Sequence, residues 1–200
     1  MNEAGQRETE AAATRSDADD DATLITGSLQ VPERFGALFD RHAPVIYRYI
    51  ARRLGRDAAD DLLAEVFLAA FQRRGHYDTT RPDARPWLYG IASRLIGRHR
   101  RDEVRFFRAI ARTGVDPAAA PLADEVTDRV AAQAVRGQLA AAIAGLPGPQ
   151  RDVLLLTASG LGYAEIAEAL GIPVGTVSSR LVRARQKVRG SVDVLNPVDE

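Results

Sequence analysis

Hydrophobic residues recur at intervals of three and four along most of this chain, which is the spacing of one face of an α-helix. Residues 35–50 begin the pattern, and an apolar stripe over residues 62–71 continues it. No segment shows the alternation of a half-buried strand. Pro86 suits the first turn of a further helix, and more helices are expected over residues 127–144, 150–158, 163–170 and 176–189. The pattern predicts an all-α protein.

Proline, glycine and polar residues divide the chain into segments. Residues 113–127 carry two prolines and little periodicity, so they predict a flexible linker between two small helical domains, 32–112 and 128–190. Residues 1–31 are rich in Ala, Asp, Glu and Thr and have no aromatic residue, which predicts a disordered acidic tail. Residues 191–200 are expected to form a second tail.

Single residues mark the helix ends within the first domain. Pro44 marks either a kink or the first turn of a second helix. Gly55 ends that stretch, and Asp57 is the expected N-cap of the helix that follows. Gly75 closes this helix and precedes a loop rich in turn residues. The breaks predict helices joined by short connections.

The net charge of zero conceals two basic blocks among acidic segments. Residues 32–113 hold 17 basic and 10 acidic side chains, and residues 146–190 hold 6 and 3. The segments 1–31, 114–145 and 191–200 each carry a net negative charge. Basic blocks with apolar periodicity are typical of folded modules that meet a polyanion, although charge alone fits solvated arginine-rich faces equally well.

The composition excludes several classes of protein. The chain has no cysteine, which rules out a disulfide scaffold, a thiolate zinc site and a cysteine nucleophile. Its start lacks the apolar core of a signal peptide, and no apolar run approaches the roughly 20 residues that span a bilayer. Neither a glycine-rich phosphate loop nor a serine–histidine–acid spacing suggests catalysis. We expect a cytoplasmic protein that is not an enzyme, has no cofactor and does not bind membranes.

The strongest local signal is the segment YAEIAEALGIPVGTVSSRLVRARQKVR. A short helix, a turn containing glycine and a longer basic helix follow in the order of a helix-turn-helix. On a helical wheel the last helix places Val177, Leu181, Ala184 and Val188 on one apolar stripe. Its opposite side is small, polar and basic, as the major groove of DNA requires. An amphipathic helix with a solvated basic side is the plainer alternative, and the preceding turn argues against it.

The exposed side of this last helix supplies candidate DNA contacts. Val182 has little structural use there and suits a thymine methyl group, whereas Arg183 suits a guanine. Arg180 and Lys187 flank the face and are placed to neutralise phosphates. The candidate residues are Thr176, Ser178, Ser179, Arg180, Val182, Arg183 and Lys187.

Three segments resemble the extracytoplasmic-function (ECF) group of bacterial sigma factors in the sigma-70 family. LPGPQRDVLLLTASGLGYAEIAEALGIPVGTVSSRLVRARQKVR is similar to their C-terminal DNA-binding region. AADDLLAEVFLAAF (58–71) resembles the helix that docks on the clamp of RNA polymerase, and RPWLYGIASRLIGRHRR (85–101) resembles the promoter −10 helix. The similarity covers about residues 33–190, with departures from the usual residues at Ala64, Phe71 and Ser178.

The resemblance implies an N-terminal domain, sigma region 2, that binds polymerase and the melted −10 element. It implies a C-terminal domain, sigma region 4, that reads the −35 element as duplex. Expected partners are core RNA polymerase, through its clamp and flap, and promoter DNA. An anti-sigma factor is a further candidate partner, because such control is frequent in the family. The residues implied at the polymerase contact are Asp60, Asp61, Leu62, Glu65 and Phe67.

Capture of a single DNA strand needs a basic groove with aromatic or apolar pockets. The loop before Pro86 and the helix after it offer both, and Arg81 lies in the same loop. Trp87 falls on the apolar stripe, so core packing is the stronger interpretation of its ring. The candidate residues for the −10 element are His76, Tyr77, Arg85, Trp87, Tyr89, Arg94, Arg98 and Arg101.

Two other functions compete with a sigma factor. A free-standing helix-turn-helix regulator explains the C-terminal helices but leaves the clamp-like and −10-like helices unexplained. A metal-dependent nuclease would use the carboxylates of Asp60, Asp61 and Glu65, which lie on nearby helix turns. That reading lacks a positioned base and a second ligand cluster, and no metal is expected. An acidic first turn also favours the helix dipole, which explains part of this cluster without a metal.

Overall fold

The computed structural model describes residues 19–115 and 126–193, and within these ranges the regular secondary structure is helical. The all-α prediction is therefore confirmed. The elements of the first range are α2 (Asp21–Gly27), η1 (Pro32–Arg34), α3 (Phe35–Leu54), α4 (Arg56–Arg73), η2 (Arg74–His76), α5 (Arg85–Arg98) and α6 (Arg100–Thr113). Those of the second range are α7 (Val126–Ala144), α8 (Gly148–Ala158), α9 (Tyr163–Leu170) and α10 (Val174–Asp193).

Helices α3 and α4 form an antiparallel pair joined at a single glycine. Helix α3 runs through Pro44 without a break. Gly55 has a φ of 90°, a conformation that side chains rarely adopt, so the chain reverses there and α4 begins at the next residue. Asp57 lies in the first turn of α4, and the prediction that it is the N-cap is wrong, because Gly55 occupies that position.

Residues 21–27 correct the prediction of a disordered tail over 1–31. They form α2, whose Leu24 and Ile25 are almost fully buried. The Asp20 side chain accepts a hydrogen bond from the Thr23 backbone N–H and caps the helix. Acidic composition predicts disorder only when nothing buries the few apolar residues, and here α3 covers them. Residues 1–18 lie outside the described part of the chain.

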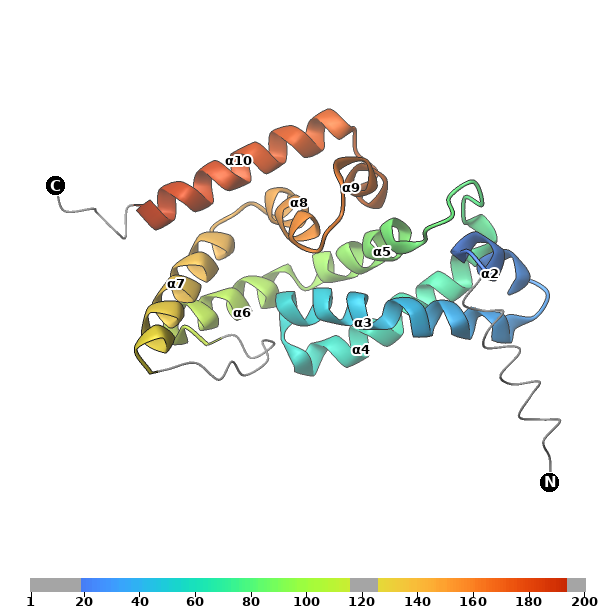
Figure 1. Ribbon diagram of the computed structural model, residues 1–200, viewed down its shortest axis with the longest axis horizontal. Coiled ribbons are helices and arrows are strands. Elements are labelled where there is room, and N and C mark those ends of the chain that lie inside the picture. The colour runs from blue at the N-terminus through green and yellow to red at the C-terminus, as the bar shows by residue number, and fades with distance from the viewer. Residues whose placement is uncertain (1–18, 116–125, 194–200) are drawn as a thin grey trace, which may run out of the picture.

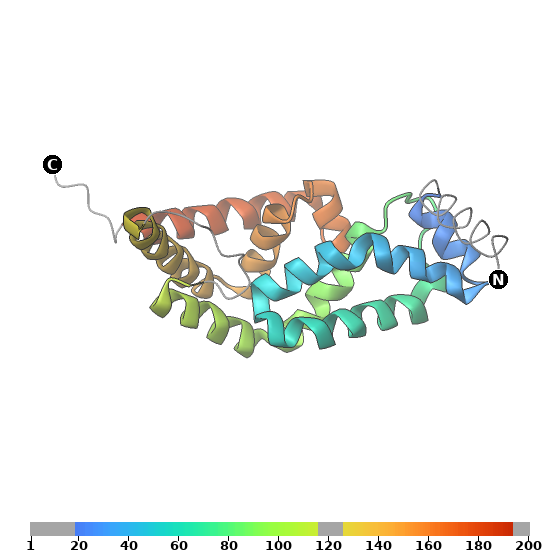
Figure 2. The same cartoon turned by 60° about the horizontal axis from the view of Figure 1, so that its bottom comes forward.

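The helices are arranged in two layers (Figures 1 and 2). One layer holds α3, α4, α5 and α6, and the other holds α8, α9 and α10. Helix α7 packs along α6, and α9 packs on α5, so the C-terminal helices fold back over the N-terminal ones. In both views α10 and α4 lie on opposite sides of the molecule.

The larger of two apolar clusters among the described residues joins the two layers. It contains Leu88 and Ile91 of α5 together with Leu156, Ile166 and Leu181 of the C-terminal helices, all at most 2% exposed. A second, smaller cluster lies between α6 and α7. The two small helical domains are therefore in direct contact along the −10-like helix.

The segments expected outside the domains are only partly described. Helix α6 extends to Thr113 and α7 begins at Val126, so residues 116–125 of the expected linker lie outside the described part. The tail expected over 191–200 is wrong for its first residues, because α10 continues to Asp193. The rest of that tail is not described. None of the described helices is both long and apolar enough to cross a membrane.

Candidate nucleic-acid interface

Helices α9 and α10 form the helix-turn-helix that the sequence predicts. Gly171, with a φ of 63°, ends α9 in a left-handed turn that an L side chain rarely adopts. On the inner side of α10, Val177, Leu181 and Ala184 are fully buried and Val188 is half-buried. The predicted apolar stripe is confirmed. It fixes the rotation of α10, so the polar side of the helix must face solvent.

The candidate −35 residues lie on or beside the exposed side of α10. Val182 is 50% exposed although it is apolar, and Arg183 next to it is also exposed. The Ser179 hydroxyl, also exposed, donates to the Thr176 carbonyl oxygen at 3.1 Å. The three half-buried members of the set are Thr176, Ser178 and Arg180, and the exposed members are Ser179, Val182, Arg183 and Lys187.

Two of the aromatic candidates for the −10 element, Tyr77 and Tyr89, are buried, and the third, Trp87, is half-buried. Tyr77 is 8% exposed and Tyr89 is 3% exposed. The rings of Tyr77 and Trp87 lie 5.0 Å apart, and Tyr89 meets Tyr49 at the same distance. Burial raises the pKa of Tyr77 and of Tyr89. In this arrangement neither tyrosine is open to a DNA base.

The basic candidates for the −10 element lie outside this core. Arg98 donates to the Glu65 carboxylate at 3.0 Å, and Arg94 donates to the Gly90 carbonyl oxygen at 3.2 Å. Arg85 is half-buried, and its Nε donates to Asp83 at 2.9 Å. The exposed members of the set are His76, Arg94, Arg98 and Arg101.

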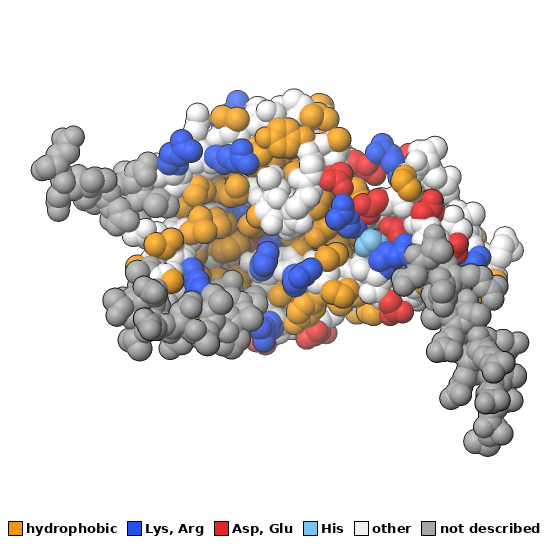
Figure 3. Space-filling view, viewed as in Figure 1, with side chains coloured by type: hydrophobic (Ala, Val, Ile, Leu, Met, Phe, Trp, Pro, Cys, Tyr) orange, Lys and Arg blue, Asp and Glu red, His pale blue; other side chains and the backbone are white. Residues whose placement is uncertain are grey.

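Helix α9 covers part of this −10 surface. Arg85 Nη2 donates to Glu165 of α9 at 3.2 Å, and Arg81 is ion-paired with Glu168 one turn later. Hydrogen bonding to Asp83 is the main cause that raises the pKa of Arg85, and the charge of Glu165 adds to it. Acidic and basic side chains gather together where α9 approaches the segment before α5 (Figure 3).

A buried ion cluster also ties the two layers together. Arg53 of α3 is 1% exposed and lies 2.5 Å from Glu103 of α6 and 2.6 Å from Asp152 of α8. Arg151 of α8 donates to Glu103 at 2.8 Å and to backbone carbonyl oxygens of the α7–α8 connection. Burial by itself would lower the pKa of Arg53, but Tyr49 and the two carboxylates raise it. Arg53 therefore keeps its charge in the interior, where both carboxylates lie within ion-pair distance of it.

Helix α4 presents an acidic face beside an apolar one. Asp60, Asp61 and Glu65 are exposed, whereas Leu62 and Phe67 are each only 5% exposed. Leu62 and Phe67 therefore support the helix from beneath. Leu68 belongs to the same face but was not among the predicted residues; it is 57% exposed and follows Asp61 by seven residues. Its spacing from Asp61 and Glu65 was the available signal.

Asp60, Asp61 and Glu65 are not among the described groups whose ligand atoms converge closely enough for a cation, and Glu65 is paired with Arg98. Asp21, His42 and Asp83 form a tighter acid–imidazole group within the described residues. Asp21 accepts from Arg41, from His42 and from the Ala84 N–H, each at 2.7 Å. Through these bonds the carboxylate of Asp21 holds α2 against α3 and against the loop before α5.

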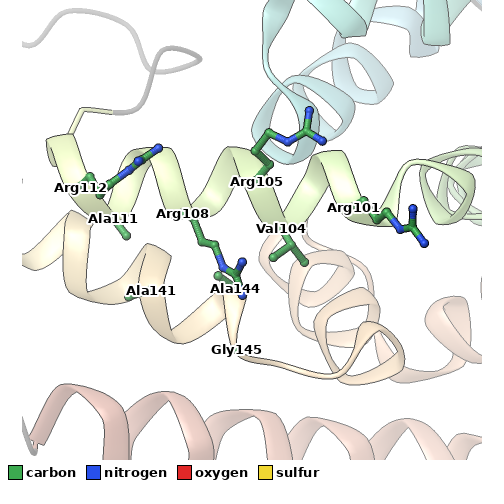
Figure 4. A pocket seen from close by; sticks show the side chains of 9 residues that line it. All are labelled: Arg101, Val104, Arg105, Arg108, Ala111, Arg112, Ala141, Ala144 and Gly145. Atoms are coloured by element: carbon green, nitrogen blue, oxygen red, sulfur yellow. The ribbon is translucent and has the colours of Figure 1, made fainter.

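A basic groove runs between α6 and α7 (Figure 4). It has a volume of about 650 Å³, and Arg101, Arg105, Arg108 and Arg112 line its α6 side. Val104 and Ala141 contribute apolar surface. Arg105 is paired with Asp102 at 3.3 Å. The groove adds positive charge beside the candidate −10 surface.

Family models match both domains. The model described as "Sigma-70 region 2" matches residues 38–106, and the model described as "Sigma-70, region 4" matches residues 136–188. The first match runs from the first turn of α3 to the middle of α6, and the second runs from the middle of α7 into α10. A free-standing helix-turn-helix regulator would not account for the match to region 2.

Curated proteins and solved structures agree with these matches. The ECF RNA polymerase sigma factor SigL of Mycobacterium tuberculosis is 38% identical over 156 residues, which cover 76% of this chain and 85% of SigL. SigW of Bacillus subtilis is 32% identical over 165 residues, 78% of this chain and 88% of SigW. The structure of CnrH in complex with the cytosolic domain of CnrY superposes with a TM-score of 0.61 at 26% identity, covering 88% of this chain and 99% of that one. The chain belongs to the ECF group of sigma factors in the sigma-70 family, the subunits that direct RNA polymerase to promoters.

Proposed function

We propose that this sigma factor divides promoter recognition between two surfaces. The exposed side of α10 reads the −35 element as duplex. The loop before α5, α5 itself and the start of α6 bind the melted −10 strand. The exposed side of α4 contacts the polymerase clamp. This division assigns residues 32–112 to region 2 and residues 128–190 to region 4.

The single observation that carries the proposal is the sidedness of α10. Three residues of its apolar stripe are fully buried, while Ser179, Val182 and Arg183 face solvent. An exposed valine between polar and basic side chains gains nothing from solvent, but it suits the thymine methyl group in a major groove. Arg183 presents a planar guanidinium that can donate two hydrogen bonds to guanine.

For the −10 strand, the arginines are the better-supported contacts. Arg94, Arg98 and Arg101 are exposed, and cations along one edge can follow a phosphate backbone. The buried rings of Tyr77 and Tyr89 support the surface from within in this arrangement. Bases can reach the part of α5 that lies under α9 only after α9 has moved away, whereas Arg94 and Arg98 are already exposed.

For the polymerase contact, Asp61 and Glu65 share an exposed face of α4 with Leu68. Phe39 of α3 is 41% exposed and packs edge-on against Phe67 at 4.7 Å. Apolar side chains beside carboxylates fit the mixed character of a protein interface. We therefore add Leu68 and Phe39 to the surface that contacts the clamp.

The proposal has consequences for location and chemistry. It places the chain in the cytoplasm with the polymerase and the promoter. It assigns nucleotide addition to the polymerase alone, so this chain carries no catalytic residue and no cofactor. Since CnrH was solved with the cytosolic domain of another protein, we also propose an inhibitory protein of the anti-sigma class as a partner.

A promoter-binding experiment tests the assignment of α10. Promoters are selected from a random DNA library with the holoenzyme, and variants with single −35 substitutions are prepared. Arg183→Ala should weaken holoenzyme binding to the selected promoter by about 5- to 150-fold, the value of a lost bidentate guanine contact. One −35 substitution should abolish the difference between wild type and Arg183→Ala. Equal losses on every substituted promoter would show that Arg183 touches only phosphate.

Arg180→Ala is the matched comparison on the same helix. Arg180 is half-buried at the edge of the exposed side, where a phosphate contact is expected. Its removal should weaken binding to all promoters alike. It should also reduce by about one the slope of the logarithm of the binding constant against the logarithm of the salt concentration. A base-specific loss for Arg180→Ala would contradict the assignment of the two arginines.

A further inference from the structure

Two carboxylates of α9 occupy the arginines at the entrance to the −10 surface. Glu168 pairs with Arg81, and Glu165 accepts from Arg85 at 3.2 Å. Both arginines also have a neighbouring acid of their own, Asp78 at 3.5 Å from Arg81 and Asp83 at 2.9 Å from Arg85. These local partners hold the guanidinium groups in place, so the arginines remain oriented if α9 departs.

The chemistry of these contacts is that of phosphate recognition. A guanidinium donates to the oxygens of a carboxylate and of a phosphate in the same way, so a phosphate would compete with Glu165 and Glu168 for the N–H groups that they occupy. Arg81 lies four residues before Arg85, which is the first residue of α5, the helix predicted to bind the melted −10 strand. An extended DNA backbone offers successive phosphates to such a pair.

The backbone of α9 sits directly on α5. Gly90 of α5 is buried, and a Cβ atom placed on it would lie less than 3.0 Å from the Ala169 carbonyl oxygen. Real Cβ atoms essentially never approach an atom so closely. The glycine therefore permits α9 to lie against the −10 helix, and any side chain at this position would push it off.

We propose that Glu165 and Glu168 stand in for DNA phosphates on Arg85 and Arg81, so that the free chain masks its own −10 surface. The inference rests on the proposed function and names a regulation of the same site. The buried side of α10 packs on α8 and α9, while the residues on its other side are exposed, so masking leaves the −35 helix open. Binding of single-stranded DNA and packing of α9 on α5 then exclude each other.

The first test uses the full chain and a fluorescent single-stranded DNA of mixed sequence, about 20 nucleotides long. Phosphate contacts are independent of sequence, so the probe does not require a known promoter. Glu165→Gln with Glu168→Gln should tighten binding by about 3- to 30-fold, the value of two partly exposed ion pairs. Glutamine at position 165 can still accept from the Gly162 N–H, so the start of α9 is preserved.

Two controls separate masking from general charge and from misfolding. Glu33→Gln with Asp40→Asn removes the same charge from exposed positions outside the α9–α5 contact, and should change binding by less than about twofold. Arg81→Gln with Arg85→Gln should cancel the gain of the glutamate variant. If the charge control tightens binding as much as the α9 variant, or if the gain survives loss of the arginines, the proposal is overturned.

A steric variant tests the same contact without any change of charge. Gly90→Ala improves the helix propensity of α5 but leaves no room for Ala169, so it should tighten DNA binding as the glutamate variant does. Gly97→Ala is the matched control in the same helix, where an added Cβ would lie 3.9 Å from the Arg100 side chain, an ordinary van der Waals distance. Equal binding by the two alanine variants would overturn the proposal.

Transcription by the wild-type holoenzyme distinguishes the two levels of failure. If the chain directs core polymerase to promoters but none of the α9 and α5 variants gains affinity for single-stranded DNA, only the masking is wrong. If the wild-type chain directs no transcription, the proposed function itself is wrong. Tight binding of single-stranded DNA by the unaltered free chain would also overturn the masking.

Discussion

Replacing Glu103 by alanine should lower the free energy of unfolding by about 3–5 kcal/mol, because it removes one partner from a buried ion cluster. The Glu103 side chain is fully buried and accepts from Arg53 Nε at 2.6 Å and from Arg151 Nη1 at 2.8 Å. Without it, Arg53 still meets Asp152 at 2.6 Å, whereas Arg151 keeps only the backbone carbonyl oxygens among its hydrogen-bond partners in the described residues. Most of the loss in stability should therefore come from Arg151, whose buried guanidinium loses its carboxylate partner.

The magnitude can be read from thermal and urea unfolding followed by circular dichroism. For a chain of this size, 1 kcal/mol shifts the midpoint by roughly 2–4 °C, so Glu103→Ala should lower it by roughly 6–20 °C. The surface control is Glu65→Ala, which breaks an exposed pair with Arg98 and should cost about 0–1 kcal/mol. Arg151→Ala should cost less in the Glu103→Ala background than alone, since the two side chains are in contact.

A loss below about 1 kcal/mol for Glu103→Ala, similar to that of Glu65→Ala, would refute this reasoning. It would mean that α8 does not seal the cluster against α3 and α6 in solution. The packing of the C-terminal helices over the N-terminal ones would then lose its main electrostatic support.

Three further outcomes are expected. Burial would raise the pKa of Asp21, but hydrogen bonds hold it below its usual range, so the stability it adds should fade below about pH 4 and the urea midpoints of wild type and Asp21→Asn should converge there. Leu181→Ala, at a fully buried position, should cost about 2–5 kcal/mol, whereas Val182→Ala should stay within about 0.5 kcal/mol. Asp61→Arg with Glu65→Arg should leave the far-ultraviolet spectrum unchanged and weaken binding to core polymerase roughly tenfold or more in a titration.

The features that could be predicted from the sequence are those set by local spacing. The buried stripe of α10 depends only on the positions of Val177, Leu181 and Ala184 relative to one another, so a helical wheel suffices. The turn at Gly171 is likewise a local requirement for a left-handed residue. Exposure of Val182 and Arg183 follows from the same rotation of the helix.

The features that could not be predicted depend on contacts between distant segments. Arginine and glutamate are normally exposed, so nothing local marks Arg53 and Glu103 as buried partners. The burial of Leu24 and Ile25 depends on α3, which an acidic composition does not reveal. Tyr77 and Tyr89 were assigned to DNA because aromatic rings suit bases. The contact of Tyr89 with Tyr49 of α3 depends on how α3 and α5 pack, which the sequence does not reveal.

Run-off transcription by bacterial core polymerase, with and without this chain, tests the central claim most directly. The template is a pool of DNA fragments, and the transcript starts are sequenced. We predict transcripts that require the chain and that share two upstream elements, at the −35 and −10 positions, with Arg183→Ala reducing only those transcripts. Transcripts that are the same with and without the chain would contradict its assignment as a sigma factor.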